Sequence, residues 1–138
     1  MRPVSTGSEA LLSDFPLKTT DKLRYGDTDR QGHVNNAAFA TFLETGRVEL
    51  VIPLAEEGAS FVIARLELDF LAELTWPGSV EIGTRIAKIG RSSVTLEQAI
   101  FQNGKCAARS VSVIVQMDNA SRRSRPLSPT AIERLNSP

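Results

Sequence analysis

A cluster of polar side chains precedes the first long apolar stretch of the sequence. Residues 27–36 contain two acids, the only histidine of the chain and two adjacent asparagines. A helix start needs only one capping side chain, so this cluster is larger than capping requires. The unpaired N–H groups and partial positive charge of a helix N-terminus suit a carbonyl oxygen that acquires negative charge. The start of the predicted helix therefore supplies half of an acyl-transfer site.

The other half of such a site is a base or a nucleophile, and Asp29 is the candidate. It lies seven residues before Asn36, on the connection that must fold back to deliver the chain into the helix. Asp is also a common turn former, which is the alternative role. In an extended segment Asp27 shares a face with Asp29, and repulsion between them would raise the pKa of one. We expect Asp27 to orient the turn.

The elements that must hold these residues follow from the periodicity of the apolar positions. Segment 17–25 has strand character, and a long helix is predicted from Asn36 to a stop at Pro53 and Gly58. Four segments with period-two alternation follow, at 61–71, 79–89, 92–102 and 106–117. The joints between them are short and turn-like, and Asn103-Gly104 is a strong hairpin signal. A strand, a buried helix and an antiparallel meander predict an α+β architecture in which the sheet curls over the helix.

Composition and chain ends narrow the class of protein. Residues 1–16 mix Pro, Ser and Gly and are predicted to form a flexible arm, whereas residues 17–138 form one domain that ends in a short helix from about Pro129, capped by Ser128. Lys plus Arg and Asp plus Glu number 16 each, so no overall basic field favours nucleic acid or membrane. One cysteine, no signal-peptide pattern and no apolar run of ~18–20 residues predict a cytoplasmic protein.

The sequence RYGDTDRQGHVNNAAFATFLETGR, residues 24–47, carries a family resemblance. It resembles the opening motif of the hotdog-fold acyl-CoA thioesterases of the 4-hydroxybenzoyl-CoA thioesterase type. In that family a strand ends in an Asp-x-Asp turn, followed by Gly, the start of a helix, an aromatic residue and a Glu-x-x-Arg. That last pair falls on Glu44 and Arg47, which we expect to form an intrahelical ion pair with an architectural role. The resemblance covers roughly residues 18–118 and includes IGRSS at 89–93.

The resemblance implies a hotdog fold and assigns roles to two residues. The second acid of the turn is the catalytic carboxylate of the family, and it falls on Asp29. The backbone N–H that polarises the thioester carbonyl falls on Asn36. His33 could contact the thioester oxygen or the catalytic water, or only hydrogen-bond the backbone, and both roles are open. We expect no metal at this turn, because its acids are not joined by a second histidine.

The same turn is similar to a second group, the plant-type acyl-carrier-protein thioesterases. Their Asp-x-Asn-x-His motif falls on Asp29, Gln31 and His33. Gln31 departs from the Asn of that motif, which weakens a chemical role for this position. Gln31 and Asn35 are instead candidate substrate contacts.

Two further groups of residues are candidates for binding the coenzyme. Arg91, Ser92 and Ser93 lie in a turn where they could hold a phosphate of coenzyme A, and a solvated hairpin tip is the alternative. The basic run at residues 122–125 offers the same two interpretations, nucleotide binding or plain solvation.

The function predicted from these residues is hydrolysis of an acyl-CoA to free acid and coenzyme A. Asp29 would act as a general base on water or as a nucleophile, and coenzyme A enters as part of the substrate, with no other cofactor. The alternatives are a hotdog hydratase or dehydratase acting on acyl thioesters, and a non-catalytic acyl-CoA-binding protein. An open meander leaves an unpaired edge, so we expect two edges to join in a homodimer, which could build a homotetramer.

Overall fold

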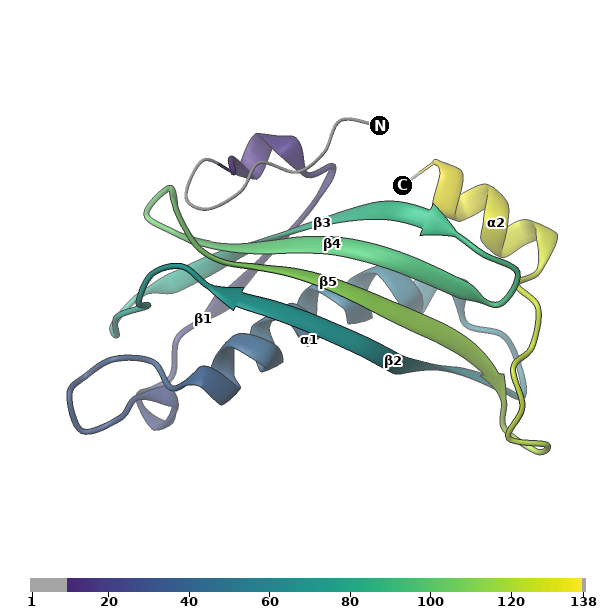
Figure 1. Ribbon diagram of the computed structural model, residues 1–138, viewed down its shortest axis with the longest axis horizontal. Helices are drawn as coiled ribbons and strands as arrows, with labels where there is room; N and C mark the ends of the chain where they lie inside the picture. Colours follow the sequence, from purple (N-terminus) through teal and green to yellow (C-terminus); the bar gives the residue numbers. More distant parts are fainter. Residues whose placement is uncertain (1–9, 138) are drawn as a thin grey trace.

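The computed structural model, which describes residues 10–137, contains one curved antiparallel sheet with a long helix along one face (Figure 1). The strands are β1 (Leu17–Lys22), β2 (Ala59–Phe70), β3 (Ser79–Ile89), β4 (Ser93–Gln102) and β5 (Lys105–Asp118). The helices are α1 (Asn36–Val51) and α2 (Pro129–Asn136), with 3-10 turns η2 (Leu12–Asp14), η3 (Tyr25–Asp27) and η4 (Ile52–Leu54). The predicted α+β architecture is confirmed.

Helix α1 begins at a capped position and buries one face against the sheet. Asn35 is its N-cap, and the Oδ1 atom of Asn35 accepts the N–H of Ala38 at 2.9 Å. Phe39, Phe42 and Leu43 are almost fully buried in the main core. The sheet supplies the other half of this core, with Val80, Ile82, Ile100, Ala107 and Ala108. Burial of this apolar surface fixes the position of the helix start relative to the strands.

The order of strands is β1-β3-β4-β5-β2, so the predicted four-strand meander is wrong at its first joint. Strands β3, β4 and β5 do follow one another, and Asn103 and Gly104 form the expected turn with φ of 52° and 79°. Strand β2 instead pairs with β5 at the far edge. Segment 71–78 therefore crosses the end of the sheet past β5 and β4, about 14 Å at the usual strand spacing. A segment of this length can span that distance, so the shortness of the joint between β2 and β3 does not show that the two strands pair as a hairpin.

Helix α1 turns Arg47, the basic member of the predicted intrahelical pair with Glu44, toward the sheet. Arg47 is only 8% exposed, and its Nη1 atom donates to Oε1 of Gln98 at 3.4 Å. Burial lowers the pKa of this guanidinium. Helix and sheet approach closely here, since a Cβ added to Gly46 would lie 2.9 Å from side-chain atoms of Gln98 and Ile82.

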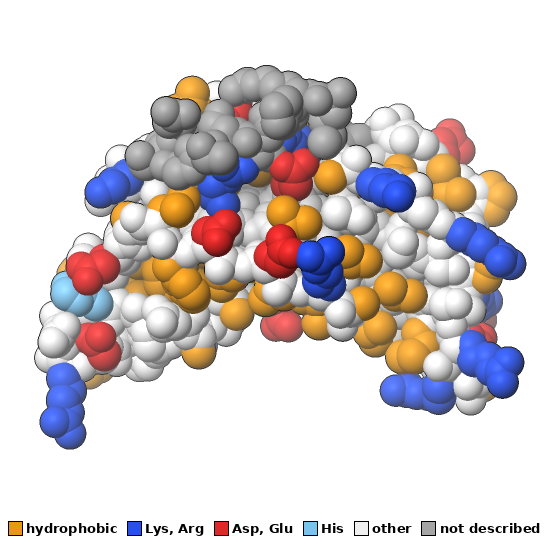
Figure 2. Space-filling model, in the orientation of Figure 1, with side chains coloured by type: hydrophobic (Ala, Val, Ile, Leu, Met, Phe, Trp, Pro, Cys, Tyr) orange, Lys and Arg blue, Asp and Glu red, His pale blue; other side chains and the backbone are white. Residues whose placement is uncertain are grey.

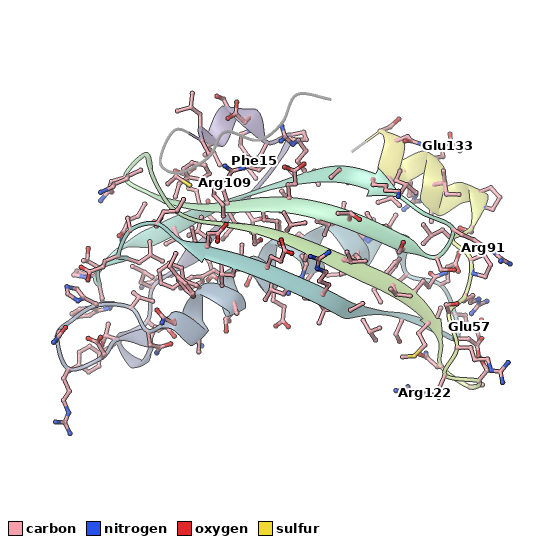
Figure 3. All side chains as sticks on the ribbon, viewed as in Figure 1. Phe15, Glu57, Arg91, Arg109, Arg122 and Glu133 are labelled. Atoms are coloured by element: carbon pink, nitrogen blue, oxygen red, sulfur yellow. The ribbon has the colours of Figure 1, made fainter. Side chains whose placement is uncertain are left out.

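Both ends of the described chain pack against the sheet. Of the predicted arm, residues 1–9 lie outside the described part, and residues 10–16 place Phe15, which is 0% exposed, on the outer face beside Phe101 and Cys106 (Figure 3). Helix α2 begins at Pro129 as predicted, where Oγ of Ser128 accepts the N–H of Ala131 at 3.0 Å. None of the helices within residues 10–137 is long and apolar enough to span a membrane.

Candidate active site

Asp27 fixes the turn between β1 and α1 from inside. Its side chain is buried, and Oδ2 accepts the backbone N–H of Arg24 at 3.0 Å. Oδ1 forms an ion pair with the Arg24 guanidinium at 3.0 Å. The hydrogen bonds from Arg24 lower the pKa of Asp27, so the rise expected from repulsion between carboxylates is not found at this residue. Asp27 orients the turn, in agreement with the prediction.

Asp29 closes the next turn with only one of its two carboxylate oxygens. Oδ1 accepts the N–H groups of Gln31 at 2.8 Å and His33 at 3.2 Å. The backbone of Asp29 also pairs with that of His33, and Gly32 makes the reversal with φ of +80°. Oδ2 has no hydrogen-bond partner among the described residues, and the side chain is exposed. One oxygen therefore holds the turn, and the other is available for a proton or an attack.

His33 is held by an acidic residue that the sequence did not identify. Its Nε2 atom lies 3.2 Å from Oε2 of Glu73, and its backbone forms a β-bridge with Thr75. Glu73 belongs to the crossing segment 71–78, which the predicted meander placed elsewhere. The one sequence feature that could have identified Glu73 is the position of a carboxylate just after a predicted strand. The contact orients the imidazole, and the alternative role, a hydrogen bond from its side chain to the backbone, is not found among the described residues.

At the start of α1, the Asn35 side chain stabilises the helix and the Asn36 backbone N–H is left without an acceptor within residues 10–137. Asn35 uses its whole side chain, because Oδ1 caps the helix and Nδ2 donates to the carbonyl of Asp27 at 2.8 Å. Asn35 does not line the groove that lies beside the start of α1. The backbone N–H of Asn36 lies in the first turn, where no intrahelical acceptor exists. It has no acceptor among the described residues, which leaves it free for a ligand oxygen.

A groove of about 380 Å³ brings four of the eight predicted site residues together. Its lining consists of Asp29, Gln31, His33, Val34, Asn36, Phe39, Phe70, Leu71, Ala72 and Glu73. The Phe39 and Phe70 rings form its apolar wall, with centroids 5.1 Å apart. Figure 2 shows the histidine at one end of the molecule, between acidic side chains and beside hydrophobic ones. Within residues 10–137, no group of three or more His, Cys, Asp or Glu side chains could hold a metal ion.

The three residues of the β3–β4 turn are not part of this groove. Arg91, Ser92 and Ser93 lie at the opposite end of the sheet, and Arg122 lies in the loop after β5 at that same end (Figure 3). The Arg91 carbonyl accepts the N–H of Leu127 at 2.8 Å, so the turn holds the segment that leads to α2. A coenzyme contact by this turn within one chain has no geometric support, and it stays a prediction for a second chain.

The sequence of this chain is similar to those of known thioesterases. The family described as the thioesterase-like superfamily matches residues 23–135. The acyl-CoA thioesterase YbgC of Helicobacter pylori is 33% identical over 85 residues, which cover 58% of this chain and 63% of that protein. The match thus spans less than two thirds of that relative.

Solved structures extend the similarity to most of the chain. A Thermus thermophilus thioesterase, solved with coenzyme A and zinc, is 31% identical with a TM-score of 0.80, over 89% of this chain and 93% of that one. The PA5185 protein of Pseudomonas aeruginosa is 25% identical with a TM-score of 0.85, over 92% and 94%. The chain has the hotdog fold and belongs to the thioesterase-like superfamily.

Proposed function

We propose that the protein hydrolyses an acyl-CoA thioester to the free acid and coenzyme A. The observation that carries this proposal is the groove in which the free N–H of Asn36 and the unpartnered oxygen of Asp29 lie beside the apolar wall of Phe39 and Phe70. The Helicobacter pylori relative is named as an acyl-CoA thioesterase, and the Thermus thioesterase binds coenzyme A. Both relatives support an acyl-CoA substrate.

In the proposed reaction the thioester carbonyl oxygen accepts the N–H of Asn36. Asp29 removes a proton from water while the water oxygen bonds to the carbonyl carbon, and the helix N-terminus stabilises the negative charge on the carbonyl oxygen. The C–S bond then breaks, and the thiolate of coenzyme A takes up a proton. Direct attack by Asp29 would instead form a mixed anhydride, which water hydrolyses to the same acid.

Thiol release from a panel of acyl-CoA esters tests this function. The panel should include short, long and aromatic acyl groups, because the sequence does not identify the acyl group. We expect free thiol, detected with a thiol reagent, from saturated acyl-CoA. A hydratase or dehydratase would release none, and a non-catalytic binder would bind members of the panel without turnover.

Replacing His33 with alanine is expected to reduce kcat/KM by less than the ~10²-fold that loss of a general base costs at minimum. The reason is that His33 lies at the groove edge and is oriented by Glu73, whereas the proton is removed by Asp29. Steady-state kinetics with one acyl-CoA measure the loss, with Glu73→Ala as the matched variant that frees the imidazole without removing it. A loss as large as that of Asp29→Asn would make His33 a direct participant.

The working unit is proposed to be a dimer formed through β2. Within residues 10–137, β5 is the only strand that pairs with β2, so the other side of β2 is unpaired there. Large apolar side chains are exposed along it, with exposures between 37% and 49% for Val62, Ile63, Leu66 and Phe70. An edge strand with an apolar face favours pairing with a second copy. Because Phe70 also lines the groove, the second chain would complete the site.

Sedimentation at micromolar concentration is expected to give twice the 15.0 kDa chain mass or a multiple of it. Ile63→Asp, which puts a charge on the β2 edge, is expected to give monomers with reduced activity. Leu11→Asp is the control. Leu11 is also exposed, at 57%, but it caps the 3-10 turn η2 and is not part of β2. An active wild-type monomer would rule out this assembly.

A further inference from the structure

The only tryptophan and the only tyrosine of the chain lie side by side on the surface. Trp76 is 42% exposed and Tyr25 is 73% exposed, and their ring centroids are 5.2 Å apart. By contrast, the rings of Phe15, Phe39, Phe42 and Phe101 are buried in the cores. An exposed aromatic pair offers a flat face on which a heterocyclic base can stack.

This pair adjoins the candidate groove through a well-fixed backbone. Glu73 lines the groove and Thr75 bridges to His33, so Trp76 follows directly on the groove wall. Gln102 holds Thr75 from both sides, because it accepts the Thr75 N–H at 3.0 Å and donates to the Thr75 carbonyl at 2.9 Å. A surface fixed in this way loses little conformational entropy when a ligand binds.

The two segments that carry the aromatic pair also form an open hollow. Its volume is about 500 Å³, and its lining is Thr20, Asp21, Lys22, Gly78 and Ser79. The segments are joined where the N–H of Leu23 donates to the carbonyl of Gly78 at 2.9 Å. The hollow and the aromatic pair therefore belong to one surface, formed by residues 20–25 and 76–79.

The charges of this surface suit an anion next to a base. Lys22 and Arg24 are exposed cations, and Lys22 lines the hollow. Two acids accompany them. Asp27 is buried in its ion pair with Arg24, and Asp21 accepts from the N–H of Lys22 and the hydroxyl of Thr45. Both carboxylates are thus hydrogen-bonded within the chain, while Lys22 is exposed and lines the hollow with Ser79, its partner in the β1–β3 pair.

We infer that the nucleotide part of coenzyme A binds this surface, with its adenine stacked on Trp76 and its phosphates toward Lys22. The inference rests on the proposed function for its choice of ligand. It places the thioester end of the substrate in the groove at Asn36 and lets pantetheine pass His33 to reach the aromatic pair. It also supplies a cation for the phosphates within one chain, where the distant Arg91 turn does not.

Fluorescence of Trp76 tests the inference without any hydrolysis, because no other tryptophan contributes. We expect 3′-phosphoadenosine 5′-diphosphate, the nucleotide part of coenzyme A, to quench this fluorescence saturably. Pantetheine alone should leave it unchanged. Unchanged fluorescence at a coenzyme A concentration that calorimetry shows to be saturating would overturn the inference, even if the enzyme hydrolyses acyl-CoA.

Kinetics with two thioesters supply the second test. Trp76→Leu is expected to raise KM for an acyl-CoA by about 5- to 150-fold, the range of a lost stacking contact. The same variant should keep its kcat/KM for the matching N-acetylcysteamine thioester, which lacks the nucleotide. Trp76→Phe should restore most of the affinity by restoring an aromatic face. Equal losses on both thioesters would show a structural role for Trp76 and would overturn the inference.

Discussion

Asp29→Asn is expected to lower turnover of an acyl-CoA by about 10²- to 10⁴-fold, the usual cost of losing a general base. The amide retains Oδ1, so it can still accept the N–H groups of Gln31 and His33 that hold the turn. It replaces the unpartnered oxygen with an NH₂ group that neither removes a proton nor attacks a carbonyl. Single-turnover and steady-state kinetics would measure the loss, while KM and Tm should change little.

The matched control for this variant is Asp27→Asn, at the other acid of the turn. Asp27 is buried and paired with Arg24, so its replacement should reduce stability more than Asp29→Asn does. If Asp29→Asn keeps nearly full activity, the catalytic assignment fails, and Asp27 and His33 become the residues to test.

Phe15→Ala is expected to lower the free energy of unfolding by about 3–5 kcal/mol, as for other buried aromatic residues truncated to alanine. Phe15 is 0% exposed, and its ring meets that of Phe101 edge to face at 6.1 Å. Arg85 lies over its other side at 5.6 Å. Gly83 makes room for the ring, because a Cβ there would lie 2.6 Å from it. Urea denaturation would measure the change.

Leu11→Ala is the control from the same segment. Leu11 is 57% exposed, so its truncation should change the free energy of unfolding by no more than about 0.5 kcal/mol. If Phe15→Ala changed the free energy of unfolding as little as Leu11→Ala does, the segment before β1 would not contribute to the folded domain in solution.

The turn that carries Asp29 was predictable because its contacts are local in sequence. The Asp29 carboxylate accepts hydrogen bonds from backbone N–H groups two and four residues later, and the Asn35 side chain accepts one from a backbone N–H three residues later. Short spacings of this kind leave signals in residue type, such as Asp and Asn at turns and caps. The position of the helix start, and with it the free N–H of Asn36, followed from the same signals.

The contacts that were missed depend on how the strands are ordered. Glu73 reaches His33 only because β2 pairs with β5, and the length of the joint after β2 allowed either a hairpin or a crossing. The spacing of Glu44 and Arg47 predicted a pair within the helix, and the contact of Arg47 with Gln98 depends on which strand faces the helix at this point. Phe15 stands alone in a segment without periodicity, and its partner Gly83 lies far along the chain.

The crossing segment 71–78 has a consequence for how such proteins diversify. It is tied to the catalytic turn through Leu74 and Thr75 and to the sheet through Gln102, but it belongs to none of the strand ladders. Leu71 and Ala72 line the groove and both donate to the Ala107 carbonyl of β5, so a change of length after Ala72 is expected to alter the groove while the β3, β4 and β5 register stays in place. Under the proposed function, a change of length at this one place is expected to change the size of the acyl group that the groove accepts.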